Sequence, residues 1–102
     1  MELKLSAAAE NDLAEARDWY NAQRGGLGDE FLLAVEARLA AMVERPLQFP
    51  LLESVSLRPF RFSLIRRFPY RIVFEVPSAD TVIVLAVAHT SRHPGAWEGR
   101  LS

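Results

Sequence analysis

The chain has 102 residues, half of them hydrophobic and a quarter charged, which is the size and composition of a single globular domain over residues 1–102. It contains no cysteine, which excludes disulfide bonds and thiolate metal sites, and no apolar run is long enough to span a membrane. The start Met1-Glu-Leu-Lys lacks the layout of a signal peptide, so we expect a cytoplasmic protein that does not engage a membrane.

The net charge of −1 hides two oppositely charged halves. Residues 1–53 carry ten acidic and five basic side chains, whereas residues 54–102 carry three acidic and seven basic ones. No acid lies between Glu53 and Glu75, and eleven of the twelve basic residues are arginine, which suits bidentate contacts with carboxylates and phosphates. This predicts an anionic partner for the second half, unless the arginines only balance the acidic half or lie on a solvated face.

The first half predicts a strand and two helices. Glu2-Leu-Lys-Leu alternates like a short strand, and Ser6 suits the N-cap of a helix from about Ala7 to Gln23. The glycine turn Arg24-Gly-Gly-Leu-Gly separates it from a helix from about Asp29 to Glu44, which stops before Pro46. The expected core stripes are Ala9, Leu13, Ala16 and Tyr20 on the first helix and Phe31, Val35, Leu39 and Met42 on the second. The acids Glu10, Asp12, Glu15 and Asp18 are expected on the other faces of the first helix.

The second half predicts a sheet. Polar and apolar residues alternate from about Leu57 to Ile65 and from Tyr70 to Val76, while Val82 to Ala88 is apolar throughout, as in a strand covered on both faces. A turn at Arg66-Arg67-Phe68 would pair Phe62 with Ile72 and Leu64 with Tyr70, and would place Arg61, Ser63 and Arg71 on the opposite face. A further turn is expected at Pro77-Ser-Ala-Asp. The fold class is therefore α+β: an N-terminal strand, a helical hairpin packed on a small antiparallel β-sheet, and a short C-terminal turn or helix whose Trp97 folds back on the core.

Several short motifs, in this order and spacing, carry a resemblance to a known superfamily. They are Asp12-Leu, Trp19-Tyr20, Gly26-Leu-Gly with Phe31, Arg45-Pro, Arg67-Phe-Pro-Tyr-Arg-Ile-Val-Phe, Val84-Leu-Ala-Val-Ala-His, Arg92-His-Pro and Trp97. With them the chain resembles the RelE/ParE superfamily of toxins from bacterial type II toxin–antitoxin systems, in the branch called plasmid stabilisation proteins.

The resemblance implies a growth-inhibiting toxin that a cognate antitoxin binds and neutralises in a hetero-oligomer. RelE-like members cut mRNA on the ribosome without a metal, whereas ParE-like members inhibit DNA gyrase without a known catalytic residue. A third possibility is a non-toxic relic that only binds its antitoxin. No cofactor and no metal site are expected, since two histidines four residues apart are a weak signal. A sheet edge and an apolar groove should remain for the antitoxin to cover.

The resemblance also assigns candidate site residues. If the chain is RelE-like, Arg71, Arg92 and His89 are its catalytic candidates, matched by motif. The candidates for contact with nucleic acid or another target are Arg58, Arg61, Arg66, Arg67 and His93. Structural alternatives stand beside these roles: His89 can cap the buried strand, and Tyr70, Trp19 and Trp97 can serve packing at the core or its rim.

Four features favour ParE-like gyrase inhibition. The chain is close to neutral, whereas a protein that binds RNA on the ribosome gains from strong positive charge. The lysine pair that some RelE members carry before Tyr-Arg is missing, as is the C-terminal tyrosine of many mRNA-cutting members. ParE-like members commonly have a histidine at the end of the last strand, where His89 lies.

Overall fold

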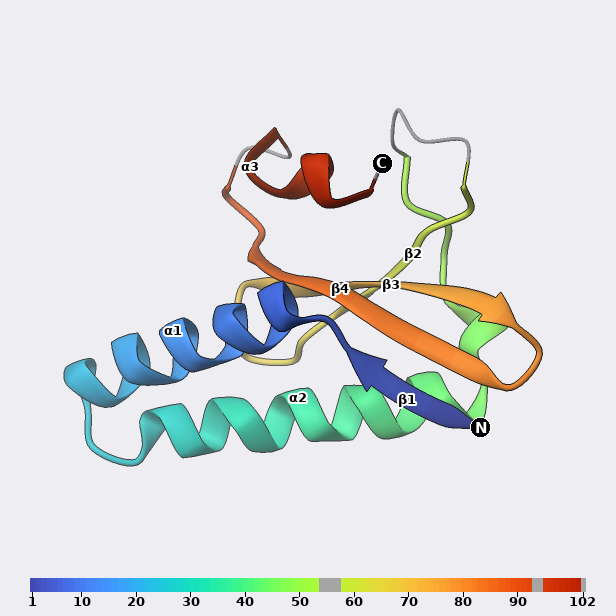
Figure 1. The fold of residues 1–102 in the computed structure, drawn as a ribbon. Coiled ribbons are helices and arrows are strands. Elements are labelled where there is room, and N and C mark those ends of the chain that lie inside the picture. Colours follow the sequence, from blue (N-terminus) through green and yellow to red (C-terminus); the bar gives the residue numbers. More distant parts are fainter. Residues whose placement is uncertain (54–57, 93–94, 102) are drawn as a thin grey trace.

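The computed structural model describes residues 1–53, 58–92 and 95–101 and shows an α+β fold (Figure 1). The strands are β1 (Glu2–Leu5), β2 (Arg61–Leu64), β3 (Tyr70–Ser78) and β4 (Thr81–His89). The helices are α1 (Ala7–Gln23), α2 (Leu27–Glu44) and the short α3 (Gly95–Glu98), with 3-10 turns η1 (Pro46–Gln48) and η2 (Gly99–Leu101). Helices α1 and α2 lie on one side of the sheet and α3 lies on the other (Figure 1). No helix in the described part of the chain is both long and apolar enough to cross a membrane.

The sheet is mixed, with strand order β1-β4-β3-β2. Strands β2, β3 and β4 are antiparallel, as predicted, but β1 joins the sheet parallel to β4, with Leu3 opposite Val82. Strand β1 spans only part of β4, so helix α1 begins beside the rest of that strand. The first and last strands of the chain are therefore neighbours.

The helical hairpin is held by its cap and its glycine turn. The Ser6 hydroxyl accepts the Ala9 N–H at 3.1 Å, which confirms the predicted N-cap. Gly26 has a left-handed φ of 89°, and a Cβ on Gly28 would lie 2.3 Å from the Arg17 carbonyl oxygen. Asn21 Oδ1 also accepts the Gly28 N–H at 2.7 Å, so α2 begins close against α1, two residues earlier than predicted.

An aromatic core fills the space between the helices and the sheet. Its rings are those of Tyr20, Phe31, Phe68 and Tyr70, with centroids 5.0 to 6.1 Å apart. Most meet edge to face, the arrangement that aromatic quadrupoles favour. The predicted stripe residues Ala9, Ala16, Tyr20, Phe31, Val35 and Met42 are all buried here.

The prediction that Asp12 lies away from the buried face of the first helix is wrong. Beyond the end of β1 the edge of β4 has no partner strand, and Asp12 Oδ2 accepts the Val87 N–H there at 3.0 Å. Only 8% of Asp12 is exposed. The carboxylate is buried because it satisfies a backbone donor that would otherwise have no partner.

The predicted register of β2 is wrong by one residue. The structure pairs Phe62 with Val73 and Ser63 with Ile72, and the Ile65 N–H donates to the Tyr70 carbonyl at 3.0 Å, so the connection is one residue longer than the predicted turn. Arg67 makes this tight turn possible with a left-handed φ of 72°. A slip of one residue exchanges the two faces of a strand. Arg61 and Ser63 therefore lie on the helix side, and only Arg71 lies on the opposite face, as predicted.

A second apolar cluster explains why the alternation was assigned to the wrong face. It lies on the sheet face opposite the helices and consists of Phe60, Val73, Ala86, Ala88 and Trp97. Phe60 alternates toward a genuine core, but that core is covered by α3 rather than by α1 and α2. Trp97 is buried, so the prediction that it folds back on the core is confirmed.

Candidate functional site at the end of strand β4

His89 closes strand β4 and is held in one orientation. Its ring stands edge-on to Tyr70 with centroids 5.2 Å apart. The Ser91 backbone N–H donates to His89 Nδ1 at 3.1 Å, and the Ser91 hydroxyl lies 2.7 Å from the same nitrogen. Because an N–H needs a lone pair to accept it, the ring hydrogen sits on Nε2. The structure thus shows His89 capping the strand end.

A small cavity of about 90 Å³ gathers the three catalytic candidates. It is lined by Arg71, His89, Thr90, Arg92 and Trp97. The Arg71 guanidinium carbon lies 5.0 Å from the centre of the Phe62 ring, and its Nε is buried without a hydrogen-bond partner among the described residues. Arg92 is exposed, and none of the described residues that line the cavity is acidic. The arrangement suits a small anion such as a carboxylate or phosphate group.

A second hollow of about 190 Å³ lies on the helix side of the same strand end. Its lining residues are Asp12, Glu15, Ala16, Trp19, Tyr70, Val87, His89 and Arg92. Burial raises the pKa of the Tyr70 hydroxyl, and burial together with the neighbouring Tyr70 raises that of Tyr20, so both remain protonated at neutral pH. Trp19 is 57% exposed and stands at the rim, one of the two positions predicted for it.

Sequence reasoning missed the ion pair that fastens the C-terminal segment to this region. Arg100 of η2 donates to both carboxylate oxygens of Asp12, at 2.7 and 3.2 Å. The hydrogen bond to Asp12 raises the pKa of Arg100. The two residues lie 88 positions apart, and neither belongs to a local motif that would have indicated the contact.

Comparison with known proteins decides the family. A family model described as the ParE toxin of the type II toxin–antitoxin system parDE matches residues 3–94. The chain belongs to the ParE toxin family. A solved structure described as the chromosomal ParDE toxin–antitoxin system from P. aeruginosa matches with a TM-score of 0.76 and 18% identity, covering 89% of this chain and 97% of that one. No curated protein matches the sequence.

Membership of the ParE family confirms the predicted superfamily and the predicted role as the toxin of a type II system. The low identity of the solved ParDE chain means that it supports the fold alone. That fold agrees with the predicted α+β arrangement of an N-terminal strand, a helical hairpin and a sheet.

In this ParE-family fold, the arginines that were predicted to contact the target do not form one cluster but have different neighbours within the chain. Arg58 pairs with Glu75, and Arg67 pairs with Glu30 on α2 at 3.1 Å. Arg61 donates to the Phe49 carbonyl at 2.7 Å, which fixes the segment before β2. Arg66 is exposed and lines a groove beside β2. His93 lies outside the described residues.

The polar groups at the strand end are either engaged within the chain or remain protonated at neutral pH. The lone pair of His89 Nδ1 is engaged by Ser91, and the hydroxyls of Tyr20 and Tyr70 remain protonated. Asp12 is engaged by Arg100 and Val87. Within residues 1–53, 58–92 and 95–101 no group of histidine, aspartate or glutamate side chains could hold a metal ion.

Proposed function

We propose that this ParE-family toxin inhibits bacterial growth in the cytoplasm by binding DNA gyrase, and that a cognate antitoxin neutralises it in a hetero-oligomer. The proposal joins the family assignment to the chemistry of the strand end. Inhibition by binding requires a stable, shaped surface and no group that abstracts a proton.

One observation carries the choice of mechanism: His89 has no free lone pair. RNA cleavage needs a base to deprotonate the 2′-hydroxyl and an acid to protonate the leaving oxygen. In the observed arrangement His89 can donate from Nε2, but Nδ1 is occupied by the Ser91 N–H. The arginines of the cavity can stabilise negative charge, but they remain protonated and do not act as bases.

A second candidate is RelE-like cleavage of mRNA on the ribosome. It is favoured by the convergence of Arg71, His89 and Arg92 on one cavity, because paired cations stabilise a phosphorane-like transition state. In this alternative Arg71 and Arg92 are the catalytic residues that hold the phosphate, and His89 acts as the acid only in its doubly protonated form, with the bond from Ser91 broken.

The experiment is induced expression without antitoxin, followed by separate pulse labelling of DNA and protein synthesis. We expect DNA synthesis to stop first. Arg71→Ala should retain toxicity, with Arg17→Ala as a control that removes the same charge from the surface of α1. Early arrest of protein synthesis that Arg71→Ala abolishes, with folding intact by circular dichroism, would favour mRNA cleavage. Normal growth on expression of the unmodified chain would indicate a non-toxic relic.

A further inference from the structure

The outer edge of β2 is only partly paired. The segment after η1 runs antiparallel to it, so that the Leu52 N–H donates to the Phe60 carbonyl at 2.8 Å and the Phe62 N–H donates to the Pro50 carbonyl at 3.2 Å. Pro50 lies opposite Phe62 and has no N–H, so it cannot supply the next bond. The Phe62 carbonyl and the Leu64 N–H therefore point outward without a backbone partner among the described residues.

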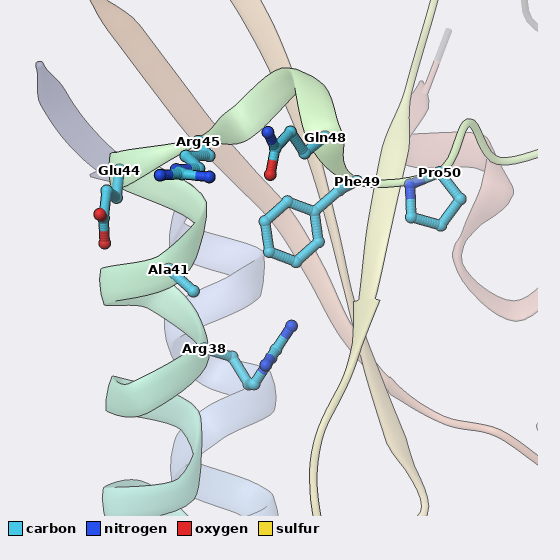
Figure 2. Close-up of a pocket in the computed structure, with 7 residues that line it drawn as sticks. All are labelled: Arg38, Ala41, Glu44, Arg45, Gln48, Phe49 and Pro50. Atoms are coloured by element: carbon cyan, nitrogen blue, oxygen red, sulfur yellow. The ribbon is translucent and has the colours of Figure 1, made fainter.

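A groove runs beside this open edge. It consists of two adjoining hollows of about 570 and 340 Å³ that share Arg38, Phe49 and Pro50. Figure 2 shows Arg38 of α2 and the Phe49 ring both projecting into the space between the helix and the strands. Leu64, 55% exposed, lines the end of the groove, and Leu47 and Leu51 are exposed nearby in sequence.

The groove also collects arginines that have no carboxylate partner. Five of the other arginines pair with acids of this chain, namely Arg17, Arg24, Arg58, Arg67 and Arg100. Among the described residues the other six arginines pair with no acid, and three of these six, Arg38, Arg45 and Arg66, line the groove. Arg38 is positioned by its bond to Ser63 Oγ at 2.9 Å and lies 5.4 Å from the centre of the Phe49 ring. Among the described residues that line the groove, Glu44 is the single acid.

We propose that an extended segment of the antitoxin, alternating acidic and apolar residues, binds here as an added strand on β2. Its backbone would bond to the Phe62 carbonyl and the Leu64 N–H. Because side chains alternate across a strand, its acidic residues would face Arg38 and Arg45 on the helix side, and its apolar residues would face Phe62 and Leu64 on the other. A second copy of this chain fits less well, since pairing two β2 edges would bring the unpaired arginines together. The identity of the partner rests on the proposed function; the chemistry of the surface does not.

The first test titrates the full chain with a short synthetic peptide that alternates glutamate and leucine. Amide hydrogen exchange should slow at Leu64 on binding. It should not change at Ile65, whose N–H is already bonded to the Tyr70 carbonyl. A peptide with lysine in place of glutamate, and one with the same composition in shuffled order, should bind at least about tenfold more weakly.

Paired variants test the charge recognition. Arg38→Ala with Arg45→Ala should weaken binding of the glutamate peptide by about tenfold, because the two arginines that face its carboxylates are lost. The matched control, Arg17→Ala with Arg24→Ala, removes the same charge from α1 and its C-cap and should change affinity by less than about twofold. Equal losses in the two pairs would show only non-specific attraction and would overturn the proposal.

Other results would also overturn it. These are an unchanged Leu64 amide in the peptide complex, equal affinity for the lysine peptide, or Leu64 protection that rises with concentration of the chain alone, which would assign the edge to self-association.

A cellular assay separates this proposal from the proposed function. Arg45→Glu should remain toxic when expressed alone but should resist neutralisation by the antitoxin. Loss of toxicity would place the groove at the target instead and contradict the assignment. If the unmodified chain is not toxic, the gyrase proposal is wrong. The peptide titration would still show whether the groove binds an added strand of alternating acidic and apolar residues.

Discussion

The two faces of the sheet are both buried, but they are built differently. The face toward α1 and α2 is covered by two long helices and contains a continuous network of aromatic rings. The opposite face is covered largely by Trp97 of a four-residue helix, and its end is fastened by Arg100 to Asp12. The helix-side face packs in a core to which both long helices and the sheet contribute. On the opposite face, the short helix α3 is held in place by the Trp97 side chain and the ion pair between Arg100 and Asp12.

The largest effect is expected on the helix side. Phe31→Ala should lower the free energy of unfolding by about 3–5 kcal/mol, since a fully buried ring that contacts three other aromatic rings leaves a cavity. Chemical denaturation should show one cooperative transition at lower denaturant. Leu33→Ala on the exposed side of the same helix is the control and should change stability little. Similar losses of stability in Phe31→Ala and Leu33→Ala would contradict the placement of the core on the sheet-facing side of α2.

A smaller and more local effect is expected on the opposite face. Trp97→Ala should lower the free energy of unfolding by about 2–3 kcal/mol, which is less than truncation of a large aromatic residue in a core usually costs. The loss is smaller because the short helix can detach while the core on the helix side stays folded. Hydrogen exchange should accelerate at α3 and η2 before it does so at α1. Uniform acceleration over the whole chain would show that the two faces unfold as one unit.

The ion pair tests the attachment itself. Asp12→Asn should cost about 1–2 kcal/mol, since the amide oxygen can still accept the Val87 N–H but loses the charge that holds Arg100, whose side chain is partly exposed. Limited proteolysis should cut the C-terminal segment faster in this variant. The control Asp18→Asn disrupts only an exposed pair with Arg17 and should change stability by less than about 0.5 kcal/mol.

The smallest effect concerns an exposed carboxylate at the hairpin end of the helix side. Hydrogen bonds from Arg67 and Arg24 lower the pKa of Glu30. Its stabilising contribution is therefore present above the ordinary pKa of glutamate and is lost as the pH falls through the lowered pKa. Glu30→Gln should make the melting temperature depend less on pH in the acid range. The melting temperature near neutral pH should be nearly unchanged. An identical acid profile in the variant would exclude this contribution.

Periodicity predicted the elements well, because both helices and the strands carry their apolar residues at regular spacing. It failed at the register of β2, since Phe60 and Phe62 follow the same alternation whichever face is buried, and a turn longer by one residue exchanges the faces. It failed again at Asp12, whose burial depends on the edge of β4, far away in sequence. Motif matching found Arg71, His89 and Arg92, which do meet at one cavity. It gave no indication of the groove arginines Arg38 and Arg45, which only the fold brings beside β2.

The parallel pairing of β1 with β4 has a consequence for how the chain is made. Glu2 is synthesised long before its partner Thr81, and Asp12 is synthesised long before Arg100. Contacts between such distant positions form late, and a domain generally folds as a unit. The sheet can therefore close only after β4 has been synthesised, so a chain that stops before Thr81 lacks the strand that joins β1 to β3 and exposes the apolar residues that the complete sheet buries.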